Sequence, residues 1–158
     1  MDMDLAQYLV AILNAASLFG RLTSGFCSDR LGKFNTFSIS CYAAGLFTLA
    51  LWIPATSQAG TIAYAALFGF FSGAYVSLIG ALVAQISPLP EIGFRTGITF
   101  LVAALPGLVT GPIAGAILDN TGSWASVKIF SGVFIIAGTT VMFGCRVVNV
   151  GWKPTAKF

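Results

Sequence analysis

Long apolar runs separated by short polar links dominate the chain. Five runs are long enough to cross the roughly 30 Å hydrocarbon core of a bilayer as helices, which rise about 1.5 Å per residue. The links are rich in turn-forming Gly, Pro, Asn and Asp. The runs lack the polar–apolar alternation of membrane β-strands. The pattern predicts an all-α, polytopic membrane protein with spans at Leu5–Phe26, Phe34–Ile53, Thr61–Ile86, Thr96–Leu118 and Val127–Cys145.

The composition agrees with a membrane location. Of the 158 residues, 57% are hydrophobic and 8% charged, whereas a soluble domain has roughly 25% charged residues. A soluble chain of this size has too small an interior to hide so much apolar surface. We therefore expect the lipid bilayer as a partner. The formal net charge of +3 is too small to indicate a nucleic-acid partner.

Enzymatic chemistry and metal binding find no support in the sequence. The chain has no histidine, and its three cysteines show no CxxC spacing. The acidic residues lie in loops and at the ends of the spans, so no pair of carboxylates or nucleophile with a base is indicated. We expect no cofactor, no metal and no enzymatic activity.

The distribution of Lys and Arg predicts the orientation in the membrane. Cytoplasmic loops carry an excess of these residues, and here seven cluster near one side while Lys128 alone falls near the other. The amino terminus is therefore expected outside and the carboxyl terminus in the cytoplasm. The seven residues are Arg21, Arg30, Lys33, Arg95, Arg146, Lys153 and Lys157.

The segment GFCSDRLGK, the predicted cytoplasmic turn between the first two spans, concentrates the charges of this chain. Arg30 and Lys33 can serve as topology anchors, with Asp29 as a helix-end residue. Alternatively, Gly25 permits close helix approach, Gly32 permits a tight reversal, and the charges lock one state of moving helices. Both interpretations stay open.

This turn resembles the signature loop of the major facilitator superfamily, which lies on the cytoplasmic side between helices two and three and again between helices eight and nine. Three segments, NAASLFGRLTSGFCSDRLGKFN, GFFSGAYVSLIGALVAQISP and GFRTGITFLVAALPGLVTGPIAGAIL, resemble helices eight, ten and eleven of the monocarboxylate-transporter-like branch, particularly its fungal members. The resemblance implies that residues 1–158 form one partial carboxyl-terminal bundle, helices eight to twelve of a twelve-helix transporter. It also implies the plasma membrane as the default location.

The first span carries polar residues at intervals of three and four, which places them on one helical face. Arg21 is the most informative, because a charge in hydrocarbon by default faces a bundle interior or a water-filled pathway. Arg21 lies five positions before Phe26, so snorkelling to the interface is the alternative. The resemblance favours a pathway role, since related transporters carry a carboxylate-binding Arg here. Ser17 replaces the acidic residue that some relatives have four positions earlier, which does not support a carboxylate–Arg proton relay. The polar positions are Asn14, Ser17, Arg21, Ser24 and Ser28.

The third span carries candidate pathway and packing residues. Its Gly69 and Gly73 form a GxxxG step that favours close helix packing. Phe71 and Tyr75 either line the substrate pathway or pack against neighbours.

The fourth span has glycines at strict four-residue spacing with two prolines between them. Small residues let backbones approach, and each proline removes a helical hydrogen bond. The span is therefore either a flexing element or a statically packed, kinked helix. The residues are Gly107, Gly111, Gly115, Pro106 and Pro112.

Together these features predict a fragment of a secondary active transporter that works by alternating access. The resemblance implies monocarboxylates or related small organic anions as substrates, proton coupling, and partner helices at the amino-terminal side. Met1 stands four residues before the first span. The alternative is a non-transporting, truncated membrane protein that associates with a full-length homologue.

Overall fold

Five long helices make up the fold of the computed structural model, which describes residues 3–55 and 57–150. All five are long and apolar enough to cross a membrane, which confirms the predicted all-α class. Each predicted span lies within one helix, except that the second continues from α2 through a π-helix, η1, and ends one residue beyond it. The helices are α1 (Met3–Leu31), α2 (Lys33–Phe47), η1 (Thr48–Trp52), α3 (Gln58–Ile86), a short 3-10 helix η2 (Leu89–Glu91), α4 (Ile92–Thr121) and α5 (Trp124–Val150).

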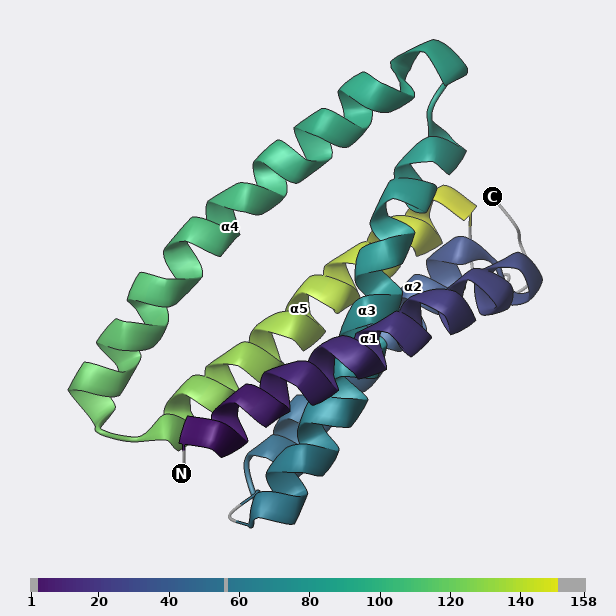
Figure 1. The fold of residues 1–158 in the computed structure, drawn as a ribbon. Coiled ribbons are helices and arrows are strands. Elements are labelled where there is room, and N and C mark those ends of the chain that lie inside the picture. Colours follow the sequence, from purple (N-terminus) through teal and green to yellow (C-terminus); the bar gives the residue numbers. More distant parts are fainter. Residues whose placement is uncertain (1–2, 56, 151–158) are drawn as a thin grey trace.

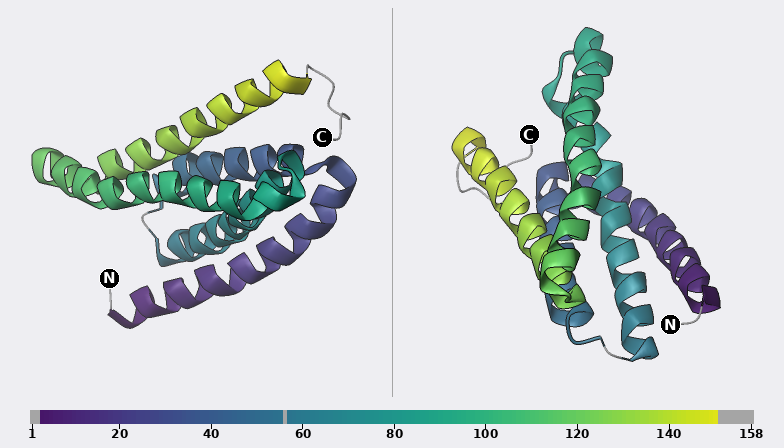
Figure 2. Two further views of the ribbon diagram at one scale, coloured as in Figure 1. Left: turned by 90° about the horizontal axis from the view of Figure 1, so that it is seen from above. Right: turned by 90° about the vertical axis from the view of Figure 1, so that its left-hand side faces the viewer.

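Successive helices run in opposite directions, so the connections gather at two ends of the molecule (Figures 1 and 2). The α1–α2 and α3–α4 connections lie at one end, which also holds Arg30, Lys33, Arg95 and Arg146. We call it the basic end. The α2–α3 and α4–α5 connections lie at the opposite end, close to Lys128, and we call it the Lys128 end. Lys153 and Lys157 fall outside the described residues.

The core lies among α1, α2, α3 and α5. Helix α1 packs most extensively against α3, and α2 packs against both α3 and α5. The buried side chains are mostly small, such as Ala44, Ala74 and Ser40. Small side chains at these contacts allow helix backbones to approach closely, as in other membrane bundles.

Helix α4 stands apart from this core (Figure 1). None of its residues is buried, whereas α3 has eight buried positions. Its main contacts in the described chain are with α3, α5 and η2. The long apolar sides of α4 are therefore open.

Candidate functional site

The seam between α1 and α3 is built on glycine. A Cβ added at Gly69 would lie 2.5 Å from the carbonyl oxygen of Leu13, and one added at Gly73 would overlap the carbonyl oxygen of Ser17. Gly20 on α1 meets the α3 backbone in the same way. The packing role predicted for the GxxxG step is confirmed.

The polar face of α1 is divided by this seam. Ser17, Ser24 and Ser28 are buried, and each hydroxyl donates a hydrogen bond to the carbonyl oxygen three residues earlier. The Ser24 hydroxyl also lies 3.0 Å from the hydroxyl of Ser77 on α3. The three serines thus satisfy their polar groups within the bundle, as buried hydroxyls must in an apolar surrounding.

Asn14 and Arg21 lie on a neighbouring, exposed strip of α1. The Asn14 amide donates to the carbonyl oxygen of Val10, in its own helix. Residues 14 and 21 are two helical turns apart, so their side chains project from the same side. The structure therefore separates the predicted pathway residues into a buried seam, with Ser17, and an open polar strip, with Asn14 and Arg21. Their pathway roles stay predictions.

The α1–α2 turn consists of one residue, Gly32, between the two helices. Its φ of 88° and ψ of 143° belong to a region that side chains disfavour. The Gly32 amide donates to the carbonyl oxygen of Ser28, and its own carbonyl accepts from the amide and the hydroxyl of Thr36. The tight reversal predicted at Gly32 is confirmed.

The charges of this turn lie at the helix ends. Arg30 occupies the last turn of α1, where a cation interacts favourably with the helix dipole. Lys33 is the first residue of α2, and Asp29 is exposed. A Cβ at Gly25 would meet no atom within 4 Å. Close approach at Gly25 and a locking role for the charges stay predictions.

Phe71 and Tyr75 pack against aromatic residues of α2. The Phe71 ring stacks on Phe47 with 5.4 Å between centroids, and the Tyr75 ring meets Phe37 edge-on at 6.4 Å. Both rings are half-buried. In the described chain they join α3 to α2, and their role along a pathway remains a prediction.

The glycines of α4 face open space. A Cβ at Gly107, Gly111 or Gly115 would meet no atom within 4 Å, and α4 continues as one helix through both prolines. The Thr110 hydroxyl donates to the carbonyl oxygen of Pro106. Neither the flexing nor the packing interpretation is decided.

A groove of about 460 Å³ separates α4 from α5; its walls are Pro106, Val109, Thr110, Ile113, Phe130, Ser131, Phe134 and Ile135.

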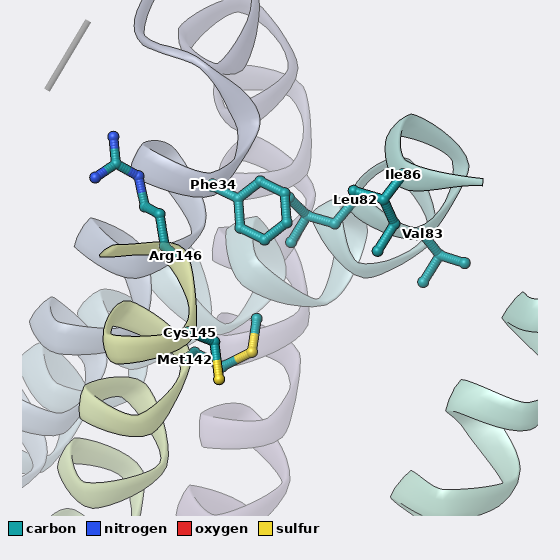
Figure 3. A pocket seen from close by; sticks show the side chains of 7 residues that line it. All are labelled: Phe34, Leu82, Val83, Ile86, Met142, Cys145 and Arg146. Carbon is teal, nitrogen blue, oxygen red and sulfur yellow. The ribbon is translucent and has the colours of Figure 1, made fainter. Parts of the chain in front are cut away.

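A second cavity, of about 380 Å³, lies at the basic end between α2, α3 and α5. Figure 3 shows Phe34 between Arg146 on one side and Leu82 on the other, with the guanidinium group directed away from Met142 and Cys145. Arg146 is 6% exposed. No pattern in the sequence indicates that this arginine, near the end of an apolar helix, is buried.

Sequence patterns also missed a cluster at the Lys128 end. Lys128 contacts Trp52 of η1, and the Trp52 ring stacks on Tyr64 of α3. The isolated position of Lys128, away from all other cations, was the available signal.

Among the described residues, no group of three His, Cys, Asp or Glu side chains is placed to hold a metal.

The fold and the glycine-based seam define a polytopic α-helical membrane protein. The chain matches the Major Facilitator Superfamily over residues 1–157. It is 57% identical to the MFS transporter asaE of Aspergillus flavus, over 100% of this chain and 36% of that protein. It is 50% identical to the fujikurins efflux protein of Gibberella fujikuroi, over 94% of this chain and 32% of that protein. The chain belongs to the Major Facilitator Superfamily.

A third relative, the aspyridones efflux protein apdF of Emericella nidulans, is 35% identical over 94% of this chain and 31% of its own length. The chain thus spans about a third of the length of the curated relatives it matches.

Proposed function

We propose that this chain forms the carboxyl-terminal helices of a secondary active transporter that moves small organic molecules across a membrane by alternating access. The family match supports transport, and the relatives named as efflux proteins favour export as its direction. Two bundles that rock about a shared midplane site are the usual basis of alternating access. One third of such a protein supplies part of one wall of that site.

The single observation that carries the substrate class is the open polar strip of α1. Arg21 belongs to a spanning helix, and its side chain is exposed in the described chain. A guanidinium group pairs with carboxylates in bidentate geometry. We therefore propose organic anions, including monocarboxylates, as substrates, with Arg21 and Asn14 on the pathway and protons as the coupling ion.

The exposed apolar sides of α4 favour packing of further helices against it. Apolar side chains such as Leu101 and Leu108 are 69% and 74% exposed, and the glycine row beside them leaves room for another backbone. We propose that helices from the remainder of the transporter pack against this row.

The position of the cations supports an orientation with the basic end in the cytoplasm. In the proposed arrangement the amino-terminal end of α1 faces outward, and the plasma membrane is the proposed location. The signature turn around Gly32 then lies in the cytoplasm, where its charges contact the opposite bundle in one state.

An export assay of the complete transporter tests the substrate proposal. We expect Arg21→Gln to reduce export of an anionic substrate at least about tenfold, because one charge-assisted hydrogen bond contributes about 1.5–3 kcal/mol. Arg21→Lys keeps the charge and should retain an intermediate rate. Thr23→Val is the matched control, since Thr23 is exposed on the same helix and donates to carbonyls of its own turn.

Equal export by wild type and Arg21→Gln, at equal protein level and at several pH values, would exclude a pathway role for Arg21. Saturable uptake by vesicles that contain only the 158-residue chain would contradict the proposal that the chain supplies part of the site.

A further inference from the structure

The Lys128 end holds a cluster of side chains from three helices. The Lys128 ammonium of α5 donates a hydrogen bond to the carbonyl oxygen of Trp52 at 2.8 Å and lies 5.4 Å from the centroid of its indole. The indole stacks on Tyr64 of α3 with 5.0 Å between centroids and 4° between planes. The Tyr64 hydroxyl lies 3.3 Å from the hydroxyl of Thr48, back in η1.

The carbonyl that Lys128 contacts is one that the helix itself leaves unpaired. Trp52 is the last residue of η1, and the last carbonyls of a helix have no donor within it. Pro54 follows two residues later and cannot continue the helix. A cation at a helix carboxyl end also interacts favourably with the dipole. Lys128 therefore caps η1 from another helix.

The element that Lys128 caps is a π-helix. A π-helix is rare and mostly occurs as a single turn within an α-helix. The Thr48 hydroxyl donates to the carbonyl oxygen of Ala44, and Thr48 is 1% exposed. Gly132 of α5 brings its backbone against Thr48 and Leu49, since a Cβ there would lie 2.5 Å from a Leu49 methyl group. Helix α5 thus contacts η1 near both of its ends.

We propose that Lys128, Trp52, Tyr64 and Thr48 form a clamp that fixes the π-helical turn and holds the Lys128 ends of α2, α3 and α5 together as one body. Lys128 is a positioning residue in this clamp, acting through the Trp52 carbonyl and ring. The clamp itself is independent of the proposed transport function. Its consequence for transport rests on that function: the three ends move together when access alternates.

Amide hydrogen exchange on the full 158-residue chain in lipid nanodiscs tests the clamp. We expect Lys128→Met, which keeps an apolar stem but loses the charge and the donor, to accelerate exchange across residues 48–53 about tenfold or more. Lys128→Arg retains charge and donors and should restore exchange to within about threefold of wild type. Tyr64→Phe keeps the stacked ring, loses the bond to Thr48 and should accelerate exchange by a smaller factor.

Ser131→Ala is the matched control, because the Ser131 hydroxyl donates only within α5, to the carbonyl oxygen of Val127. It should leave exchange at residues 48–53 within about twofold of wild type. Exchange in Lys128→Met within the same twofold range would overturn the clamp. So would equal acceleration by Lys128→Met and Lys128→Arg, since charge and donors would then be irrelevant.

The complete transporter tests the consequence for transport separately. Lys128→Met should lower the export rate several-fold at unchanged protein level, and Lys128→Arg should recover it. If Lys128→Met accelerates amide exchange at residues 48–53 but leaves the export rate unchanged, the clamp is supported and its proposed role in transport is overturned. Absence of export by the wild-type transporter would count against the proposed function and would leave the exchange result unaffected.

Discussion

Helices α3 and α4 carry the same sequence signal with opposite structural outcomes. Each has glycines four residues apart, at Gly69 and Gly73 in α3 and at Gly107 and Gly111 in α4. In α3, these glycines meet the backbone of α1, while in α4 a Cβ at either position would touch nothing. The spacing therefore predicts that another helix backbone can pack closely against this face. Only the structure identifies which helix does so.

The contrast extends to burial. In an 18-residue apolar stretch of α3, 28% of the residues are buried within the described chain, while in the corresponding stretch of α4 none is buried. The two stretches are equally apolar, each with a mean hydropathy of 1.9. Hydropathy thus identifies both as membrane spans without distinguishing a packed helix from an open one. The open helix belongs to a chain that covers about a third of the length of its relatives, which agrees with the proposal that helices of the complete transporter pack against α4.

The largest effect is expected for Gly73→Leu. The new side chain would overlap the backbone at Ser17, which a rotamer change cannot relieve. Overpacking of this kind costs about 1–3 kcal/mol and more where backbones must separate. We expect a loss of at least about 3 kcal/mol in the free energy of unfolding of the chain, measured by denaturant titration in detergent micelles.

Gly80→Ala is the control for this substitution, because Gly80 is on the same helix and a Cβ there would meet no atom within 4 Å. It should change the free energy of unfolding by less than about 1 kcal/mol, in the stabilising direction, since Ala is the better helix former. Equal stability of Gly73→Leu and Gly80→Ala would show that α1 and α3 do not meet at Gly73.

A smaller effect is expected at the hydroxyl pair that crosses the seam. A double-mutant cycle of Ser24→Ala and Ser77→Ala should give a coupling free energy of about 0.5–1 kcal/mol, as interhelical hydrogen bonds in membranes do. Each hydroxyl also lies within hydrogen-bond distance of a carbonyl oxygen of its own helix. Because a hydroxyl has one proton, one serine donates across the seam while the other donates to its own carbonyl, so the single substitutions are mild. A coupling energy indistinguishable from zero would mean that the two hydroxyls share no bond.

The smallest loss of stability in the isolated chain is expected for Gly111→Leu. Apart from the backbone of its own helix, nothing in the described chain lies within 4 Å of its Cβ position. We therefore expect no destabilisation and a gain in unfolding free energy of less than about 1 kcal/mol, since Leu is a better helix former than Gly. In the complete transporter the same substitution should reduce the folded fraction or the export rate several-fold. Tolerance in both proteins would indicate that this face of α4 meets lipid.

The five spans were predictable because crossing a bilayer demands long apolar runs. A tight reversal at Gly32 was predictable because glycine adopts backbone conformations that other residues disfavour. That the link consists of a single residue was not predicted. The division of the α1 polar face was not. Ser17 and Arg21 are four residues apart, yet one is buried and the other exposed. The side on which α3 packs decides between them, and this depends on contacts far apart in sequence.

The clamp around Lys128 escaped prediction for a related reason. Its members come from η1, α3 and α5, and no local spacing connects Trp52 with a residue 76 positions later. The π-helical turn was not predicted either, since π-helices are rare. Likewise, the aromatic residues Phe71 and Tyr75 fit a pathway and a packing role equally well until their ring partners on α2 are known.

The most direct test of the pathway proposal asks what surrounds the open strip of α1. A nitroxide label at Asn14→Cys, in the complete transporter with its native cysteines replaced, reports collisions with a water-soluble paramagnetic reagent and with oxygen, which concentrates in lipid. If Asn14 and Arg21 face a water-filled passage, the water-soluble reagent should dominate. Dominant collisions with oxygen would place this strip against acyl chains and contradict the proposed role of Arg21.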